Sequence, residues 1–171
     1  MKNFLSLTLY YLIFTRLPNS RVPIGRFFNT LRIFILKGFI SIGKNNTIQT
    51  KVYFGSGKNI KIGNNCQIND NVRLDNVTIK NNVMIARDTI ILGKSHKFKS
   101  LDIPMNLQGV DSSKKTTIED DVWIGLRAVI LPGVKISKGT IIGACSLVNK
   151  DTEPYGIYAG IPAKLIKRRN I

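Results

Sequence analysis

Aliphatic residues recur at every sixth position over most of this chain, and this spacing restricts the fold more than any other feature of the sequence. The repeat begins after residue 41, runs in blocks, and in its last block continues without a break. The repeated positions are Ile42, Ile48, Phe54 and Ile60; Ile62, Ile68 and Leu74; Ile79, Ile85 and Ile91; then Ile118, Ile124, Ile130, Ile136, Ile142 and Val148. Neither a helical period near 3.6 nor the two-residue alternation of a strand produces such a spacing.

The period of six predicts a parallel β-helix in which each hexad forms one short strand and one corner. The repeated aliphatic side chain points into a narrow core. The position two before it is small or β-branched, as at Val122 and Ala128, while Gly, Asn and Asp fill the corners, as in IGNN at 62–65. Three hexads close one turn, and successive turns stack at about 4.8 Å. A β-sandwich would instead show strand alternation and hairpin turns, which are missing from this pattern.

The charge of the chain is strongly positive and unevenly distributed. The 171 residues, a length typical of one domain, carry a formal net charge of +16, and no Asp or Glu precedes Asp70. Such a field attracts polyanions, anionic lipid surfaces or phosphate-bearing ligands, although a general effect on solubility is an equally good interpretation. We expect no nucleic-acid partner, because the basic residues lack the interleaved aromatic residues that would stack on bases.

Two apolar segments precede the repeat and read as helices that each bury one face. The first, residues 4–14, is shorter than the roughly 20 residues needed to span a bilayer, and no signal-peptide cleavage site follows it. The second, residues 27–40, has Arg32 and Lys37 on its expected polar side. Residues 1–41 are therefore predicted to be an apolar, basic helical leader. It would pack on its own protein, on a neighbouring subunit or, through residues 1–40, on a membrane surface.

The repeat is interrupted over residues 92–117, and the single histidine of the chain, His96, lies near the start of the interruption. Long insertions in compact folds are more often functional than idle. Imidazole, with a pKa near 6.5, is suited to accept a proton at neutral pH, whereas a surface histidine without a role is the alternative. We expect no metal site, since one histidine and two remote cysteines cannot supply a ligand set. Cys66 is read as a packing residue and Cys145 as a weak candidate nucleophile.

Three segments carry a resemblance to a known family. DDVWIGLRAVILPGVKISKGTIIGACSLVNKD (120–151) and AGIPAKLIKR (159–168) resemble the hexapeptide-repeat acyltransferases, and NNVMIARDTIILGKSHKFKSLDIP (81–104) is similar to their catalytic-loop region. The closest similarity is to the branch of maltose/galactoside and exopolysaccharide (colanic acid type) O-acetyltransferases. The resemblance implies a homotrimer that binds acetyl-CoA between neighbouring subunits.

The fold expected from the repeat and the resemblance together is all-β. It is a left-handed parallel β-helix over residues 42–150, with the insertion at 92–117 and the helical leader at 1–41. Residues 151–171 are expected to end in a short basic helix. The left hand of the coil is implied by the family, because periodicity alone does not determine it.

The resemblance also implies roles for individual residues. His96 would deprotonate the acceptor hydroxyl, which attacks the thioester directly, while backbone N–H groups of a neighbouring coil stabilise the oxyanion. Asp75, Asp88, Asp102 or a backbone carbonyl would orient the imidazole.

The acceptor pocket would contain Asn69 or Asn71, Asp102, and Trp123 unless Trp123 packs at the trimer seam. The cofactor groove would contain Gly125, Leu126, Ala144, Asn149 and Lys150, with Lys164 and Lys167 on the phosphates. The family usually has Ala, Ser or Gly in place of Leu126 and Thr in place of Asn149.

The function expected from the sequence is acetyl-CoA-dependent O-acetylation of a sugar hydroxyl in surface or capsular polysaccharide synthesis. The acceptor would be free, nucleotide-linked or lipid-linked, and the protein cytoplasmic or held at the inner face of the cytoplasmic membrane. Two other functions remain open at this point. One is N-acetylation of an amino-sugar nucleotide or O-acetylation of serine. The other is a non-catalytic scaffold or a membrane-surface protein.

Overall fold

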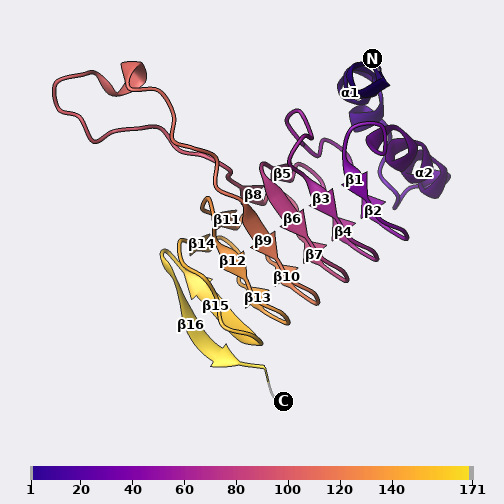
Figure 1. Ribbon diagram of the computed structural model, residues 1–171. Coiled ribbons are helices and arrows are strands. Elements are labelled where there is room, and N and C mark those ends of the chain that lie inside the picture. The colour runs from indigo at the N-terminus through magenta and orange to yellow at the C-terminus, as the bar shows by residue number, and fades with distance from the viewer. Residues whose placement is uncertain (1, 170–171) are drawn as a thin grey trace.

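The computed structural model describes residues 2–169 and shows a three-sided β-solenoid with helices at its N-terminal end (Figure 1). The helical elements are α1 (Lys2–Leu12), η1 (Phe14–Arg16), α2 (Gly25–Leu36) and η2 (Met105–Leu107). The strands are β1 (Ser41–Ile42), β2 (Thr47–Ile48), β3 (Lys61–Ile62), β4 (Gln67–Ile68), β5 (Arg73–Leu74), β6 (Val77–Ile79), β7 (Met84–Ile85), β8 (Ile90–Ile91), β9 (Thr116–Ile118), β10 (Trp123–Ile124), β11 (Val129–Ile130), β12 (Lys135–Ile136), β13 (Ile141–Ile142), β14 (Leu147–Val148), β15 (Gly156–Gly160) and β16 (Ala163–Arg168).

The strands form three sheets, one on each side of the coil. Their orders are β1-β3-β6-β9-β12, β16-β15-β13-β10-β7-β4-β2 and β14-β11-β8-β5. Neighbouring strands are parallel throughout, except for the antiparallel pair β15–β16. Each chain turn therefore contributes one short strand to each sheet, as three hexads per turn predict. The predicted parallel β-helix is confirmed, while its left hand stays the expectation set by the family.

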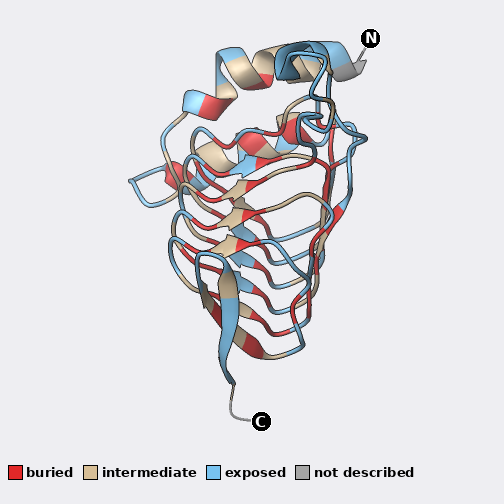
Figure 2. Cartoon of the chain, turned by 90° about the vertical axis from the view of Figure 1, so that its left-hand side faces the viewer, coloured by how far each residue is buried: buried red, intermediate tan, exposed pale blue. Residues whose placement is uncertain are grey.

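The repeated aliphatic residues stack directly on one another inside the coil. Ile68 pairs with Ile85, Ile85 with Ile124, and Ile124 with Ile142, so that one ladder runs along the seven-stranded sheet. Leu74 begins the equivalent ladder of the four-stranded sheet. These side chains are buried, as Figure 2 shows for the interior of the coil. The ladder continues across the breaks in the period because extra or missing residues are taken up at corners.

The corners use the left-handed backbone conformation that the pattern predicts. Asn65, Asn82 and Gly139 all have φ between 58° and 69°. Asn reaches this region at low cost, and glycine without strain, whereas a residue with a larger side chain is strained there. Arg127 and Cys145 nevertheless have φ of 55° and 57° at the next corner of the coil, between the seven-stranded and four-stranded sheets. The coil geometry therefore imposes the conformation even where the residue type disfavours it.

The leader covers the N-terminal end of the coil (Figure 2). The Tyr10 hydroxyl donates a hydrogen bond to the Val52 carbonyl at 2.7 Å, and its ring packs on those of Phe39 and Phe54. Phe4 and Leu12 of the same helix remain exposed. The expected packing of this segment on its own protein therefore accounts for one face of α1 only. No helix in residues 2–169 combines the length and the apolarity needed to cross a membrane.

Arg32 does not lie on the polar side of the second helix, and this expectation was wrong. Its side chain is 0% exposed and donates hydrogen bonds to the carbonyl oxygens of Phe14, Leu17, Pro18 and Ile48. Three of these carbonyls belong to the segment that follows α1, and that of Ile48 belongs to β2, the edge strand of its sheet. Within residues 2–169, no further strand pairs with β2 on this side. Burial lowers the pKa of Arg32, and four acceptors replace its lost hydration.

The predicted basic helix at the C-terminus was also wrong, because residues 156–168 form the hairpin β15–β16. β15 pairs with β13 in parallel and puts Tyr158 next to Ile142, which extends the core ladder. β16 then pairs with the free edge of β15. Unpaired N–H and C=O groups at a sheet edge favour such an added strand over a short isolated helix. Arg168 and Arg169 pair with Glu153 and Asp121.

An arm projects from the coil between β8 and β9 (Figure 1). Its two strands of chain run antiparallel, with hydrogen bonds from the Asp111 N–H to the Ser95 carbonyl at 2.8 Å and from the Lys97 N–H to the Gly109 carbonyl at 3.1 Å. η2 lies in its outer part. The interruption of the hexad repeat is therefore an extended hairpin, and the ladder of coils resumes directly beneath it, where β9 pairs with β6.

Candidate active site

His96 lies at the root of the arm, where the hairpin leaves the coil. It is exposed and forms an isolated antiparallel bridge with Val110 on the returning chain. Its side chain lines a cavity of about 310 Å³. Arg73, Asp75, Lys94 and Ser95 also line this cavity, together with residues of β8 and Val110. The only imidazole of the chain therefore faces a concave site that contains a carboxylate and two cations.

The arm root is held to the coil by a short chain of hydrogen bonds. The Asn76 side-chain amide donates to the Ser113 hydroxyl at 2.7 Å, and this hydroxyl donates to the Gly93 carbonyl at 2.9 Å. The Lys114 N–H donates to the same carbonyl at 2.8 Å. A Cβ atom on Gly93 would lie 2.8 Å from the Asp75 carboxyl carbon, so only glycine allows this close approach. These contacts fix the position of the chain that carries His96.

The structure separates the three carboxylates that could orient His96. Asp75 lines the His96 cavity. Asp88 lies at another corner, where it accepts a hydrogen bond from the Asn71 amide at 3.0 Å and pairs with Arg127 at 3.7 Å. Asp102 is exposed in the outer part of the arm. Asp75 is therefore the one of the three that shares a cavity with the histidine.

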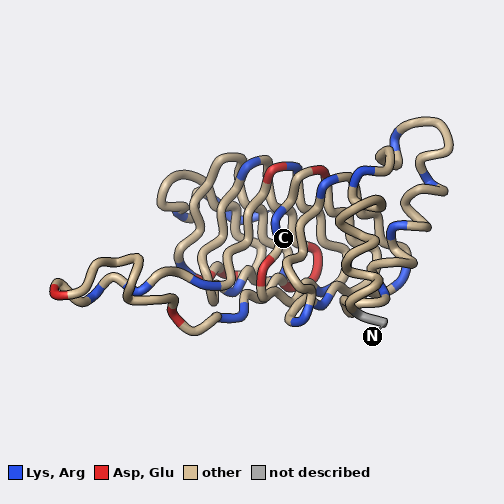
Figure 3. Tube along the Cα trace, turned by 90° about the horizontal axis from the view of Figure 1, so that it is seen from above, with Lys and Arg blue, Asp and Glu red and all other residues tan. Residues whose placement is uncertain are grey.

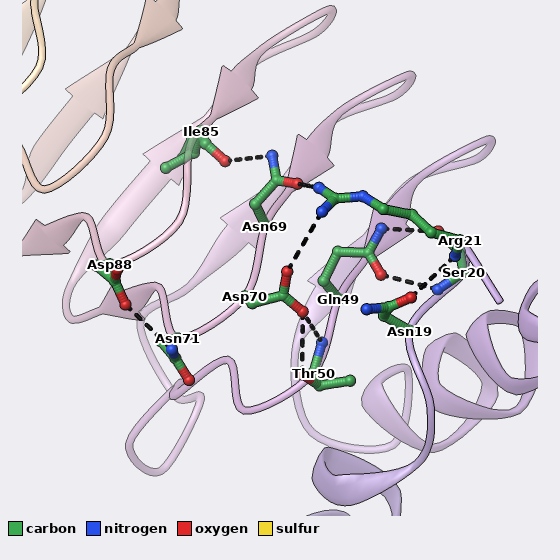
Figure 4. A network of polar contacts seen from close by, with 10 residues as sticks. All are labelled: Asn19, Ser20, Arg21, Gln49, Thr50, Asn69, Asp70, Asn71, Ile85 and Asp88. Carbon is green, nitrogen blue, oxygen red and sulfur yellow. Dashed lines mark hydrogen bonds and ion pairs between the residues drawn. The ribbon is translucent and has the colours of Figure 1, made fainter.

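The residues expected in the acceptor pocket lie outside the His96 cavity of this protomer. Asn69 donates a hydrogen bond to the Ile85 carbonyl at 2.9 Å and accepts one from Arg21 at 2.5 Å (Figure 4). Asn71 and Asp102 have the positions described above. Trp123 projects from the seven-stranded sheet and is 48% exposed. A single chain thus does not bring these four side chains to His96.

The network around Asn69 reaches back to the leader (Figure 4). Arg21, in the connection between η1 and α2, also lies 3.9 Å from Asp70, and Asp70 accepts hydrogen bonds from the N–H and hydroxyl groups of Thr50. This role of Arg21 could not be predicted from the sequence, because its partners are 48 and 49 residues away. The leader is therefore connected to the corner that carries Asn69 and Asn71.

The residues expected at the cofactor divide between two corners and the C-terminal hairpin. Gly125 is buried, and its N–H donates to the Ile142 carbonyl at 2.8 Å; a Cβ there would lie 2.7 Å from the Ala144 nitrogen. Its role in this protomer is close stacking of the coils. Leu126 and Ala144 are accessible at the corner after β10 and β13. Asn149 lines a second cavity of about 200 Å³, which shares Lys94 and Ser95 with the His96 cavity.

The basic residues expected at the cofactor phosphates are accessible. Lys150, Lys164 and Lys167 are exposed, and none of them is among the ion pairs of the described residues. The neighbouring Arg168 and Arg169 are neutralised by carboxylates. Ammonium groups without an ion-pair partner can bind phosphate oxygens.

Arg73 in the His96 cavity and its aromatic neighbour Tyr53 were not expected from the sequence. Arg73 lines the His96 cavity, and its guanidinium carbon lies 4.5 Å from the centroid of the Tyr53 ring. Both residues immediately precede a repeated aliphatic residue and therefore point out of the coil. The alternation within the hexad could have identified them as surface residues, but not the place of Arg73 in the His96 cavity.

The cysteines show no sign of a reactive site. Cys66 is buried, burial raises the pKa of its thiol, and it packs as expected. Cys145 is exposed at its corner. Within residues 2–169 no three His, Cys, Asp or Glu side chains are grouped so as to hold a metal ion.

Comparisons with known proteins agree with the fold. A family model described as bacterial transferase hexapeptide (six repeats) matches residues 115–150. The galactoside O-acetyltransferase of Escherichia coli (strain K12) is 36% identical over 135 residues, which span 77% of this chain and 65% of that protein, just under two thirds of its length.

Two solved structures match almost the whole chain. A galactoside acetyltransferase in complex with coenzyme A has 33% identity and a TM-score of 0.80, and the match covers 99% of this chain and 81% of that one. A hexapeptide-repeat acetyltransferase from Vibrio cholerae O1 biovar eltor, complexed with acetyl-CoA, has 28% identity and a TM-score of 0.81, with 97% and 86% covered. The chain therefore belongs to the hexapeptide-repeat acyltransferases, in the branch that contains the galactoside and maltose O-acetyltransferases.

Proposed function

We propose that this protein transfers the acetyl group of acetyl-CoA to a hydroxyl group of a carbohydrate, with His96 as the general base. The observation that carries the proposal is the position of His96. In a chain of this family, the only histidine lines a cavity at the root of an arm and shares that cavity with Asp75. Galactoside acetyltransferases are the relatives that match most of its length, which favours a sugar as the acceptor.

The proposed chemistry needs one proton transfer by the protein. Bound acetyl-CoA would supply the acetyl group as an activated thioester. The acceptor hydroxyl loses its proton to a ring nitrogen of His96 as its oxygen attacks, and the proton later leaves for solvent or the departing thiolate. Asp75, which lines the same cavity, would orient the imidazole. The hydrogen bonds at the arm root hold the chain that carries His96, which would reduce the entropy lost in the reaction.

An acetyl-transfer assay with radiolabelled acetyl-CoA and a panel of glycosides tests this proposal. The wild-type protein should acetylate at least one glycoside of the panel, and product mass should identify an O-acetyl ester. His96→Ala should retain acetyl-CoA binding and lose transfer. Transfer by His96→Ala at the wild-type rate would remove His96 as the base.

The cofactor part of the proposal places the coenzyme A phosphates on Lys150, Lys164 and Lys167 and its pantetheine arm near Leu126, Ala144 and Asn149. Gly125 would support this groove through the stacking of its neighbours. A thermal-shift experiment tests this part: coenzyme A should raise the melting temperature, and adenosine should not. The double variant Lys164→Gln/Lys167→Gln should weaken coenzyme A binding about tenfold or more, because each charged contact contributes strongly. Unchanged binding would exclude these two lysines.

We also propose that the active unit is a homotrimer. Two features of the chain support it. The residues expected at the acceptor and cofactor lie on separate corners, and the arm exposes Leu101, Met105 and Leu107 away from the coil, with Leu101 98% exposed. A neighbouring subunit would cover this apolar surface and supply Asn69, Asn71 or Trp123 to the His96 cavity. Light scattering coupled to gel filtration should give three times the chain mass, and Leu101→Asp/Leu107→Asp should dissociate the assembly.

The polysaccharide role and the membrane contact are proposed from the leader. Phe4, Leu5, Leu12, Phe27 and Phe34 are exposed there. Figure 3 shows Lys and Arg but no Asp or Glu on the leader. Apolar side chains with surrounding cations bind the surface of an anionic bilayer, which would place the enzyme at the inner face of the cytoplasmic membrane. Flotation with vesicles containing 30% anionic lipid, compared with neutral vesicles, should show binding only to the former; equal recovery from both would contradict this.

A further inference from the structure

A groove of about 520 Å³ beside the leader has no role in the reaction described so far. It is lined by Tyr11, Thr15, Arg16, Lys51, Val52 and Tyr53. These residues come from α1, η1 and the chain that precedes β3, so the leader and the first coil build the groove together. It contains two cations and two aromatic rings, and no carboxylate lines it.

Arg73 connects this groove to the His96 cavity. It lines the His96 cavity, its guanidinium carbon lies 4.5 Å from the centroid of the Tyr53 ring, and its backbone forms a bridge with Tyr53. Tyr53 in turn lies beside Tyr11, with ring centroids 5.7 Å apart. The surface therefore continues from the histidine, through a cation, to two aromatic rings, and ends at Arg16 and Lys51.

The guanidinium of Arg73 stacks on the Tyr53 ring, and its N–H groups form no ion pair within the described residues. Stacking on Tyr53 restricts its plane and leaves its N–H groups without a carboxylate partner, because Arg73 is not among the ion pairs of the described residues. Arg16 and Lys51 are exposed and likewise unpaired there. An oriented guanidinium without a partner is suited to bind two oxygens of a phosphate group.

The two tyrosines provide flat apolar area rather than charge. The Tyr11 hydroxyl donates to the Gly55 carbonyl at 2.9 Å and accepts from the Phe54 N–H at 3.0 Å. Burial raises the pKa of Tyr11 to about 12, so it stays neutral. Tyr53 is 42% exposed. The groove thus has an aromatic floor between cations, with no negative charge to repel an anion.

We propose that the acceptor is a glycosyl phosphate or diphosphate, whose phosphate groups bind Arg73 and whose carrier lies over Tyr53 and Tyr11 toward Arg16 and Lys51. This inference rests on the proposed acetyl transfer for the reacting hydroxyl at His96, but the phosphate site is defined by its own residues. A neutral glycoside would leave Arg73 and the groove beyond it without a partner. The sugar would lie in the His96 cavity and the carrier outside it, which matches the order of the side chains along the surface.

Binding measurements at saturating coenzyme A test the site without any acetyl transfer. The coenzyme occupies its own phosphate site, so calorimetry with inorganic pyrophosphate then reports the remaining one. Pyrophosphate should bind the wild-type protein with an affinity that falls as salt rises. Arg73→Gln should weaken it at least tenfold, and Lys51→Gln about threefold. Arg87→Gln, which removes an exposed charge elsewhere on the coil, is the matched control and should change it less than twofold.

Two further probes distinguish the carrier. Uridine diphosphate represents a nucleotide-linked acceptor, and farnesyl diphosphate in detergent represents a lipid-linked one. At least one should bind more tightly than pyrophosphate, and Tyr53→Leu should remove most of that gain, because the gain comes from contact with the ring. Circular dichroism and the melting temperature confirm that each variant is folded.

The outcomes separate this inference from the proposed function. Pyrophosphate that fails to bind the coenzyme complex, or that binds Arg73→Gln as well as wild type, overturns the inference even if neutral glycosides are acetylated. Arg73-dependent pyrophosphate binding by a protein that acetylates nothing would instead retain the phosphate site and remove the acetyltransferase.

Discussion

The coil and the arm use apolar side chains in opposite ways. In the coil, Ile85, Ile124 and Ile142 stack in one buried ladder. In the arm, Phe98, Leu101 and Met105 are exposed, although the arm begins after β8 and ends before β9 of the same coil. The coil therefore buries its aliphatic residues, which stabilises the fold, whereas the arm leaves its apolar residues exposed. Substitutions in the coil should change the free energy of unfolding, and those at the arm root should change the rate of transfer.

The largest effect should follow from His96→Ala. Removal of a general base should lower the rate of acetyl transfer by about 10²- to 10⁴-fold. The melting temperature should not change, because His96 is exposed and its bridge with Val110 uses the backbone only. The rate with the best glycoside of the panel and a thermal melt measure both quantities. Lys99→Ala, an exposed arm residue that lines neither cavity beside His96, should leave the rate unaltered. A similar loss in both variants would mean that the arm as a whole was disturbed.

The next largest effect should be on stability, from Ile124→Ala in the coil. Ile124 is 0% exposed between Ile85 and Ile142, so truncation should lower the free energy of unfolding by about 2–5 kcal/mol. Urea denaturation measures this change, and the transfer rate per folded molecule should stay at its wild-type value. Met84→Ala is the matched control, since Met84 is on the neighbouring strand but points outward. Equal losses for the two would contradict the buried ladder.

A smaller effect should come from Ser113→Ala at the arm root, where coil and arm meet. The variant removes the hydroxyl that joins the Asn76 amide to the Gly93 carbonyl. Because the arm then moves more freely, we expect kcat to fall about tenfold with an unchanged KM for acetyl-CoA, and stability to fall by about 1 kcal/mol. Ser113→Thr retains the hydroxyl and should restore kcat. A rate that Thr does not restore would indicate that Ser113 positions nothing.

The same contrast explains how far the sequence could predict this molecule. The coil was predictable because each hexad is a local sequence pattern. The six-residue spacing from Ile118 to Ile136 can be recognised without knowing which residues the neighbouring coils place against it. Arg32 was wrongly predicted to be exposed because its four carbonyl partners lie outside the helix that carries it. The helical pattern shows only that Arg32 is charged, not that these carbonyls surround it. The C-terminal hairpin was missed because the free edge of β13 exists only in three dimensions.

The candidate site divides in the same way. His96 was predicted from its position after Ile91 and from the family resemblance. The close approach of Gly93 to Asp75 could not be predicted, because the hexad spacing is irregular between these two residues. Arg73 and Tyr53 are 20 residues apart in sequence and meet because two coils stack. Residues that act across coils therefore escape a sequence pattern that describes one coil at a time.

The smallest effect tests whether the corners of the coil take part in chemistry. Cys145 has φ +57° at its corner and an exposed thiol. A left-handed conformation costs a residue with a Cβ about 1–2 kcal/mol, and glycine avoids this strain. Part of the gain is lost because glycine makes the unfolded chain more flexible. Cys145→Gly should therefore raise the free energy of unfolding by about 0.5–1 kcal/mol. Its backbone hydrogen bond to Leu126 is retained. Cys145→Ala keeps the strain and should leave stability unchanged. Both variants should transfer acetyl at the wild-type rate, because direct attack on the thioester needs no protein nucleophile. A loss of rate in both variants would give the corner thiol a catalytic role. It would contradict the expectation that substitutions in the coil change stability and not the transfer rate.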